Sequence, residues 1–358
     1  MNIRYFLAGL ALTAALAAQT KPPFLLIDTH NDITSKTVDG LDIGATGNPT
    51  TMTDIGRLRA GGVGAVFFAA FVDAKYVQGN HSANRALQMI DTIRTDIVAA
   101  HPNDFALATS ADEIEKAHRE GKIAALIGIE GGHAIEDSLR LLRDYFALGV
   151  RYMTLTHFNT NDWADSSGDI ENTAIAHHNG LTPFGKQVVT EMNRLGMMVD
   201  ISHVADKTFW DALATSQAPL IASHSSCRAL TNAPRNMTDA MITALAEKGG
   251  VIQINFYCDF IKQKANPPTL NDVVDHIDHA VKIAGIDHVG IGSDFDGIEC
   301  APVGLKDVSQ FPNLTRALEA RGYNSGQIAK LYGLNTLALM RKVEAVSRQM
   351  QAAGAKAQ

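Results

Sequence analysis

The chain alternates between short runs of apolar, often β-branched residues and longer amphipathic stretches. Eight of the apolar runs are typical of buried strands, and they lie at residues 24–30, 63–72, 123–131, 150–158, 197–203, 219–225, 250–257 and 288–295. Between them, apolar side chains recur at helical spacing, for example in 82–100, 136–149, 182–196 and 269–285. The polar segment from Asn159 to Asn179 predicts a long loop after the fourth strand.

Eight buried strands that alternate with helices predict a parallel sheet. We expect a (β/α)8 barrel of the TIM type, and the alternative is an open, doubly wound sheet. No internal repeat, low-complexity tract or linker interrupts this rhythm. The pattern therefore predicts one domain that extends from residue 18 to residue 358.

Residues 1–17 have the pattern of a secretory signal peptide, with Arg4 before an apolar run and with small residues at Ala15 and Ala17 for cleavage. The mature chain would begin near Ala18 and would be periplasmic or secreted. The apolar run is shorter than the ~20 residues that a membrane-spanning helix needs. The C-terminal AAGAKAQ is not the apolar tail that directs a lipid anchor, so we expect no membrane anchor.

The overall composition limits the class of partner. With 46% hydrophobic residues among 358, the chain can bury a large core. Its formal charge of -7 argues against nucleic acid or an anionic membrane surface as partner and favours a small molecule. The three cysteines, Cys227, Cys258 and Cys300, allow at most one disulfide within the chain. We favour buried apolar roles for them, and whether any two of them pair stays open.

Residues that commonly bind metals recur where the predicted strands end. They are His30 and Asp32 after the first strand, Glu130 at the third, His157 at the fourth, His203 at the fifth, His224 at the sixth and Asp294 at the eighth. In a closed parallel barrel, all carboxyl ends of the strands meet on one face. We therefore expect these side chains to share one pocket.

Three carboxylates in one buried pocket would be costly unless cations compensated their charge. Imidazole and carboxylate ligands without thiolate suit Zn²⁺, and Mn²⁺ or Co²⁺ are also compatible. A glutamate that bridges two ions would leave open positions for water, and such a pair can lower the pKa of a bridging water to about 7. The predicted chemistry is hydrolysis.

Other histidines fit this site less well. His276 and His279 are three residues apart on a predicted helix, but the surrounding charges are typical of a solvated face. His133, in the sequence EGGH, is better placed to support the site than to bind metal directly.

These segments together resemble the renal (membrane) dipeptidase family of zinc metallopeptidases, within the amidohydrolase-like barrels. The resemblance extends from Leu26 to about Met340. It rests on the ordered motifs DTHND, GIEGGHAI, RYMTLTH followed by WADS, VDISHV, SHSSCRAL followed by APRNMTD, and VGIGSDFDG.

The resemblance implies a site with two Zn²⁺ ions per subunit. In it, His30 and Asp32 would hold one ion, His203 and His224 the other, and Glu130 both. The implied activity is hydrolysis of the amide bond of dipeptides, L-Xaa-L-Xaa and also L-Xaa-D-Xaa, by a hydroxide that bridges the metals.

The resemblance also implies roles for three further residues. His157 would contact the scissile carbonyl of the substrate, and Arg235 would pair with the C-terminal carboxylate of the dipeptide. Asp294 would act as general base and then general acid, with Asp296 as the less favoured candidate.

Two alternative functions stay open. One is another binuclear amidohydrolase that acts on N-acyl amino acids or lactones, and the other is a non-catalytic periplasmic binder of metal or peptide. The presence of Asp294 argues against the binder, which needs no proton shuttle. The mammalian relatives are disulfide-linked dimers, and this chain has no clear counterpart of their cysteines, so a homodimer is left open.

Overall fold

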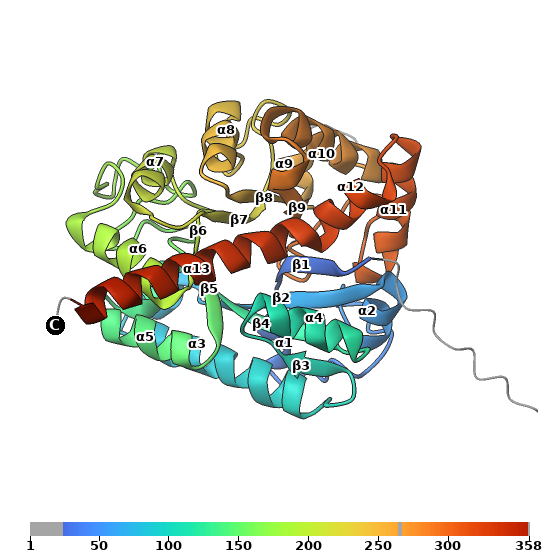
Figure 1. The fold of residues 1–358 in the computed structure, drawn as a ribbon, viewed down its shortest axis with the longest axis horizontal. Helices are drawn as coiled ribbons and strands as arrows, with labels where there is room; N and C mark the ends of the chain where they lie inside the picture. The colour runs from blue at the N-terminus through green and yellow to red at the C-terminus, as the bar shows by residue number, and fades with distance from the viewer. Residues whose placement is uncertain (1–23, 264–266, 357–358) are drawn as a thin grey trace, which may run out of the picture.

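The structure, a computed structural model, describes residues 24–263 and 267–356. The signal peptide expected at residues 1–17 lies outside these ranges. Figure 1 shows the strands at the centre of the molecule with helices around them. The strands are β1 (Leu26–Asn31), β2 (Val63–Phe71), β3 (Phe105–Leu107), β4 (Ile123–Glu130), β5 (Val150–Thr154), β6 (Met198–Asp200), β7 (Ile221–Ser225), β8 (Val251–Ile254) and β9 (Val289–Ile291).

The α-helices that connect and cover these strands vary widely in length. They are α1 (Thr34–Thr37), α2 (Ile55–Gly61), α3 (Ser82–Thr92), α4 (Ala111–Arg119), α5 (Leu139–Ala147), α6 (Pro183–Leu195), α7 (Asp206–Thr215), α8 (Asp239–Glu247), α9 (Cys258–Ile261), α10 (Leu270–Ala284), α11 (Phe311–Ala320), α12 (Ser325–Ala329) and α13 (Asn335–Lys356). Two π-helical segments, Ile93–Ala99 and Lys330–Leu334, continue α3 and precede α13.

The sheet is parallel throughout, in the order β1-β2-β4-β5-β6-β7-β8-β9. Its two edges approach each other after β9, where Asn31 bridges Phe295 in parallel and the amide of Asp294 donates to the carbonyl of His30 at 3.0 Å. The result is a nearly closed barrel. The (β/α)8 prediction is confirmed, and the open doubly wound sheet is excluded.

All eight predicted strands are present, but several end earlier than the sequence predicts. β5 ends at Thr154, β6 at Asp200 and β9 at Ile291, so the residues that follow them belong to loops. The short β3 strand, which pairs with β4 outside the main order, was not predicted. The long loop after β5 is confirmed, since α6 begins only at Pro183.

The amino-terminal ends of the strands are filled with apolar side chains. Met198, Ile221 and Val251, at the starts of β6, β7 and β8, share a buried cluster with Leu337 and Met340 of α13. This long C-terminal helix runs across the barrel (Figure 1). Because that end is packed with apolar groups, a polar site is left to the opposite end, where the strands finish.

Candidate metal and substrate site

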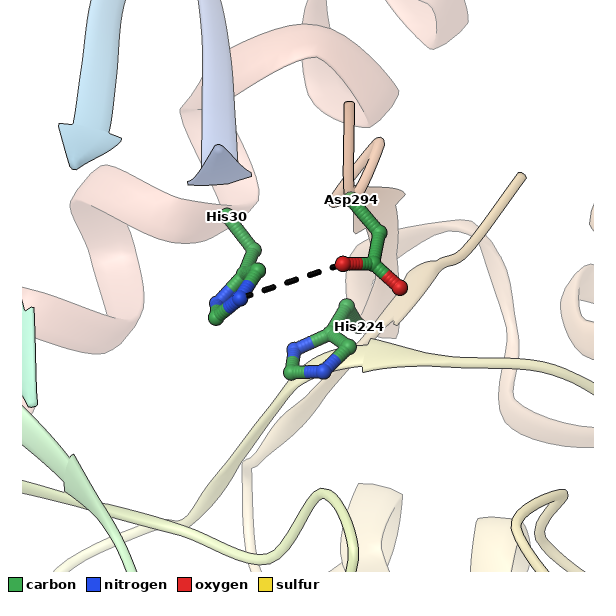
Figure 2. Close-up of side chains that lie close together, drawn as sticks. All are labelled: His30, His224 and Asp294. Atoms are coloured by element: carbon green, nitrogen blue, oxygen red, sulfur yellow. Dashed lines mark ion pairs between the residues drawn. The ribbon is translucent and has the colours of Figure 1, made fainter. Parts of the chain in front are cut away.

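The five predicted metal ligands and the predicted proton-transfer residue Asp294 come from five different strand ends. His30 is in β1 and His224 in β7, Glu130 is the last residue of β4, and Asp32, His203 and Asp294 lie in the loops just after β1, β6 and β9. Figure 2 shows the side chains of His30, His224 and Asp294 converging from separate segments. The structure thus brings together residues that are up to 264 positions apart in the sequence (294 minus 30).

Glu130 lies at the centre of this cluster. Its Oε1 is 3.0 Å from His203 Nε2 and 3.3 Å from His224 Nε2, while its Oε2 is 3.5 Å from His30 Nε2. His30 Nε2 is also 3.2 Å from Asp32 Oδ2 and 4.0 Å from Asp294 Oδ1. One oxygen of Glu130 therefore faces the imidazoles of His203 and His224, and the other faces the imidazole of His30. A carboxylate that bridges two cations would have this arrangement.

The chemistry of these donors fits a pair of metal ions. His30 Nε2 and Asp32 Oδ2 are buried, and although they lie 3.2 Å apart, neither makes a hydrogen bond with any described residue. The Nε2 atoms of His203 and His224 are only 2.9 Å apart, both directed at one carboxylate oxygen. Buried polar atoms are rarely left unpaired in proteins. Cations between them would satisfy all of these atoms at once.

The electrostatics of the cluster show how strongly its charges interact. Burial raises the pKa of Asp294 well above its ordinary value, and the nearby carboxylates of Asp32 and Glu130 raise it further, against the effect of His30. Burial would raise the pKa of Glu130 as well, but the imidazoles of His30, His157, His203 and His224 hold it well below its ordinary value. Glu130 is thus ionised without metal, which suits a ligand.

The backbone around the site is strained at two of these residues. His203 has φ of +67° and Asp294 has φ of +65°, in the left-handed region that non-glycine residues seldom adopt. The carbonyl of His203 accepts hydrogen bonds from the amide and hydroxyl of Ser167, in the long loop after β5. The loop therefore helps to fix a residue of the site, and strain of this kind is common where side chains must be aimed precisely.

The backbone at Gly297 passes close to the carboxylates of Asp32 and Asp294. A Cβ atom at this position would lie 2.3 Å from Asp32 Oδ2 and 2.8 Å from Asp294 Oδ1. Any side chain here would have to push these oxygens away.

A pocket of about 350 Å³ opens over the cluster. Its floor includes the ligand candidates Asp32, Glu130 and His203, together with His157 and Asp294, and its walls include Phe71, Phe158, Tyr257, Phe260 and Ile298. His157 Nε2 lies 3.9 Å from Glu130 Oε1, so His157 faces both the pocket and the cluster. A pocket of this size suits a small molecule.

A disulfide joins two walls of this pocket. Cys258, next to Tyr257 on one side, is bonded to Cys300, which follows Ile298 and Glu299 on the other. Our expectation of buried apolar roles holds for Cys227, which is free and buried, and was wrong for the other two. The pairing depends on α9 and the loop after β9 meeting in space, which spacing along the chain cannot show.

Arg235 is adjacent to the cluster but is itself buried. Its Nη2 donates to the carbonyl of His224 at 2.8 Å and its Nη1 to Ser225 Oγ at 3.0 Å, while its Nε has no hydrogen-bond partner in the described part of the chain. The guanidinium lies 5.6 Å from the ring centre of Phe260, a wall of the pocket. Burial lowers the pKa of Arg235 to about 10, so it stays cationic at neutral pH.

Three histidines that the sequence set apart from the metal ligands are His133 and His276, which are buried, and His279, which is partly buried. The prediction of a solvated face was wrong for His276, which is 1% exposed, because its ring accepts from the amide of Cys227 and contacts the carbonyl of Ile261. His279 pairs with Asp239 at 2.7 Å. His133 is buried with Nε2 2.9 Å from the carbonyl of Val72. Asp296, the less favoured proton-transfer candidate, is bound to Lys36 at 2.9 Å.

Several polar residues behind the cluster were missed from the sequence. Tyr152 OH lies 2.8 Å from His30 Nδ1, and Asn255 Nδ2 donates to Asp294 Oδ2 at 2.8 Å. Asp28 and Asp200 are fully buried acids within apolar runs. That unusual placement was the signal that could have identified the two acids, since buried carboxylates require partners.

Comparison with known proteins is consistent with this geometry. Residues 16–354 match the membrane dipeptidase family, peptidase family M19. Among curated relatives, an uncharacterized dipeptidase of Schizosaccharomyces pombe is 40% identical over 343 residues, which cover 91% of this chain and 82% of the relative. Dipeptidase verJ of Clonostachys rogersoniana is 40% identical over 349 residues, covering 92% and 87%.

Solved structures give the same result. A metallopeptidase of Rhodobacter sphaeroides, solved with a phosphinate mimic of the dipeptide L-Ala-D-Ala, is 28% identical with a TM-score of 0.81, over 89% of this chain and 99% of that one. The probable dipeptidase PvdM of Pseudomonas aeruginosa is 26% identical with a TM-score of 0.80, over 90% and 96%. Within residues 24–263 and 267–356, no helix combines the length and apolarity that crossing a bilayer requires. The resemblance seen in the motifs is confirmed: the chain belongs to the membrane dipeptidase family, and it is a peptide hydrolase.

Proposed function

We propose that this protein is a zinc-dependent dipeptidase with two ions in each chain. His30 and Asp32 would hold one ion, His203 and His224 the other, and Glu130 both. The observation that carries this proposal is the central position of Glu130, with its two oxygens facing His30 on one side and His203 with His224 on the other. When bound, the ions supply Lewis acidity to the scissile carbonyl and lower the pKa of a water molecule.

Asp294 is the residue best placed to move protons. It faces the pocket, its Oδ1 lies 4.0 Å from His30 Nε2, and Asn255 holds its other oxygen. A carboxylate with a raised pKa can accept a proton from the attacking water and return it to the leaving amine near neutral pH. His157, across the pocket, is placed to orient the carbonyl oxygen and to stabilise the negative charge that develops on it.

Arg235 would bind the C-terminal carboxylate of the dipeptide. Its Nε has no hydrogen-bond partner among the described residues, its guanidinium is cationic, and that group lies against the ring of Phe260 on the pocket wall. Arg235→Ala should raise KM for dipeptides strongly with a smaller change in kcat, because the interaction contributes to binding. Arg235→Lys keeps the charge but loses the paired donors, so a partial effect is expected. An unchanged KM in Arg235→Ala would reject this role.

The proposed substrates are short L,L and L,D dipeptides. Support comes from the small pocket and from the similar metallopeptidase whose structure holds a mimic of L-Ala-D-Ala. The test is hydrolysis of a panel of L,L and L,D dipeptides, N-acyl amino acids and lactones by the purified protein, before and after chelation and after addition of Zn²⁺. Turnover of dipeptides that is lost on chelation and restored by Zn²⁺ supports the proposal, while turnover confined to the other substrates would favour a different amidohydrolase.

We also propose that residues 1–17 are a signal peptide and that the mature protein is periplasmic or secreted. The sequence pattern supports this, and the Cys258–Cys300 disulfide is of a kind that persists in oxidising compartments. Amino-terminal sequencing of the protein from its native host tests the cleavage site. Light scattering of the purified protein decides whether it is a homodimer.

A further inference from the structure

Behind His224 lies a buried acid that the proposed chemistry does not use. Asp200, the last residue of β6, is fully buried. Its Oδ1 accepts from the backbone amides of Ser223 at 2.8 Å and Ser202 at 3.1 Å. Its Oδ2 accepts from the hydroxyls of Ser223 at 2.6 Å and Thr154 at 2.5 Å. Four donors from three neighbouring strand ends thus converge on the two oxygens of one side chain.

The hydrogen bond between Ser223 and Asp200 determines whether the serine hydroxyl donates a hydrogen bond to His224 or accepts one from it. Ser223 Oγ is 2.7 Å from His224 Nδ1. A carboxylate can only accept hydrogen bonds, so the hydroxyl proton of Ser223 is directed at Asp200, and its oxygen is left to accept. Nδ1 of His224 must then carry the proton. Nε2 is left with its lone pair facing Glu130 and His203, which is the form that binds a metal.

The same contact also aligns two strands that are weakly paired. β6 and β7 share a single residue pair, Asp200 with Ile221. The two hydrogen bonds that Ser223 donates to Asp200 therefore help to hold the end of β7 against β6, together with the bond from the amide of His224 to Ser202 Oγ. Since His203 follows β6 and His224 belongs to β7, this contact bears on the 2.9 Å separation of their Nε2 atoms.

A second acid makes the same pair of bonds to a serine, and its contact with a histidine, at 3.5 Å, is to the backbone amide of His30 instead of an imidazole. Asp28 of β1 accepts from the amide of Ser293 at 2.8 Å and from its hydroxyl at 2.5 Å, across the seam between β1 and the segment after β9. The next residue there is Asp294, which has no tautomer to be set. Asp28 is thus a natural control for the loss of a buried carboxylate that joins strands.

We propose that Asp200 is a positioning residue that acts through Ser223 to fix His224 in its Nδ1-protonated, metal-binding tautomer. This rests on the proposed function, in which His224 binds zinc. In such an arrangement the carboxylate orients the ligand through an intervening hydroxyl instead of contacting it directly, and outer partners of metal ligands typically contribute 10 to 100-fold in metal affinity.

The hydrogen bonds that connect Asp200, Ser223 and His224 form a relay, and Asp200→Asn should reverse their direction. The two backbone amides require the amide oxygen of the new side chain at the position of Oδ1, so its NH2 group faces Ser223 Oγ and Thr154 Oγ1. Of the two acceptors then left to the hydroxyl of Ser223, His224 Nδ1 at 2.7 Å is closer than Ser202 Oγ at 3.4 Å. Donation to Nδ1 places the imidazole proton on Nε2, where the metal would bind. Ser223→Ala removes the relay without enforcing the wrong tautomer. The asparagine variant should therefore be the more damaging of the two.

The experiment compares the wild-type protein with Asp200→Asn, Ser223→Ala and Asp28→Asn. Zinc affinity is measured by competition with a chromophoric chelator, and thermal unfolding of the metal-free proteins is recorded in parallel. We expect the affinity of one of the two sites to fall about 100-fold in Asp200→Asn and about 10-fold in Ser223→Ala. Asp28→Asn should lower stability but leave the Nδ1–H tautomer of His224 intact, because Asp28 is bonded to Ser293 and to the backbone amide of His30. Equal zinc affinity in Asp200→Asn and wild type, or a larger loss in Ser223→Ala, would overturn the proposal.

The tautomer itself is read from the ¹⁵N shifts of His224 in the metal-free protein, which separates this inference from the proposed function. The wild type should show Nδ1–H and Asp200→Asn should show Nε2–H. If Asp200→Asn does not fold, Ser223→Ala decides: mixed tautomers support the relay, and a pure Nδ1–H form contradicts it. A wild-type protein that shows Nδ1–H but binds no zinc would refute the proposed function while supporting the relay.

Discussion

Replacing Gly297 by alanine should displace two carboxylates of the site without removing any polar group. The new Cβ would lie 2.3 Å from Asp32 Oδ2 and 2.8 Å from Asp294 Oδ1. Non-bonded carbon and oxygen atoms keep at least ~3.3 Å apart, so Asp32 Oδ2 must move by about 1 Å. Gly297 does not have a positive φ, and alanine can adopt its backbone conformation without strain. The effect is therefore confined to the position of the carboxylates.

A displacement of about 1 Å in a catalytic arrangement costs on the order of 100-fold in rate, which is about 2.7 kcal/mol. We expect kcat/KM of Gly297→Ala for a dipeptide to fall by this factor, and zinc affinity at the site that contains Asp32 to weaken. Steady-state hydrolysis and metal analysis of the dialysed protein measure the two effects.

Gly354→Ala is the matched control, since no atom of residues 24–263 or 267–356 outside its own helical neighbours lies within 4 Å of its Cβ position in α13. It should leave activity and metal content unchanged. Suppose instead that Gly297→Ala kept the activity, zinc content and unfolding temperature of the wild type. The carboxylates of Asp32 and Asp294 could then not lie as close to Gly297 as the structure places them.

Three further predictions concern the supports of the site and the core. Replacing Cys258 and Cys300 by serine opens a cross-link that spans 42 residues, which should lower the free energy of unfolding by up to about 4 kcal/mol in urea titrations; an unchanged midpoint would show that the bond does not stabilise the fold. Tyr152→Phe removes the hydroxyl that contacts His30 Nδ1 and should weaken zinc binding about 10-fold in chelator competition, whereas unaltered affinity would exclude that support. Burial lowers the pKa of His276 to about 4 from 6.5, so the unfolded chain takes up its proton first as the pH falls. The contribution of neutral His276 is thus fully present above pH 6.5 and is lost toward pH 4, by up to about 3 kcal/mol, and unfolding curves of His276→Gln should lack this part of the pH dependence.

Much of the barrel could be predicted because its signal is local. A buried strand is a short apolar run and an amphipathic helix repeats its apolar face, so the eight main strands and helices such as α6 and α10 are visible without any knowledge of their partners. The β3 strand was missed because three residues carry too little pattern. The strand ends were predicted too late because apolar residues continue past the last paired residue, as Leu155 does after Thr154.

Burial was harder to predict than helicity. The helical segment around His276 has a charged sequence, and the prediction of a solvated face followed from that charge pattern. In the structure, Cys227 and Ile261 cover one side of that helix and satisfy both ring nitrogens of His276. The residues that cover His276 lie outside its own helix, so the sequence of that helix cannot show that His276 is buried.

The sequence by itself determined the kinds of elements, their order and the chemical types of the side chains at the strand ends, because each depends on neighbours only a few residues away. Only the tertiary structure decided which of these side chains meet. Closure of the barrel places Glu130 between His30 and the pair His203 and His224, joins Cys258 to Cys300, and places Asp200 behind Ser223. Those contacts join residues from different strands and loops, and their distances are set by the packing of the whole barrel, which no local pattern contains.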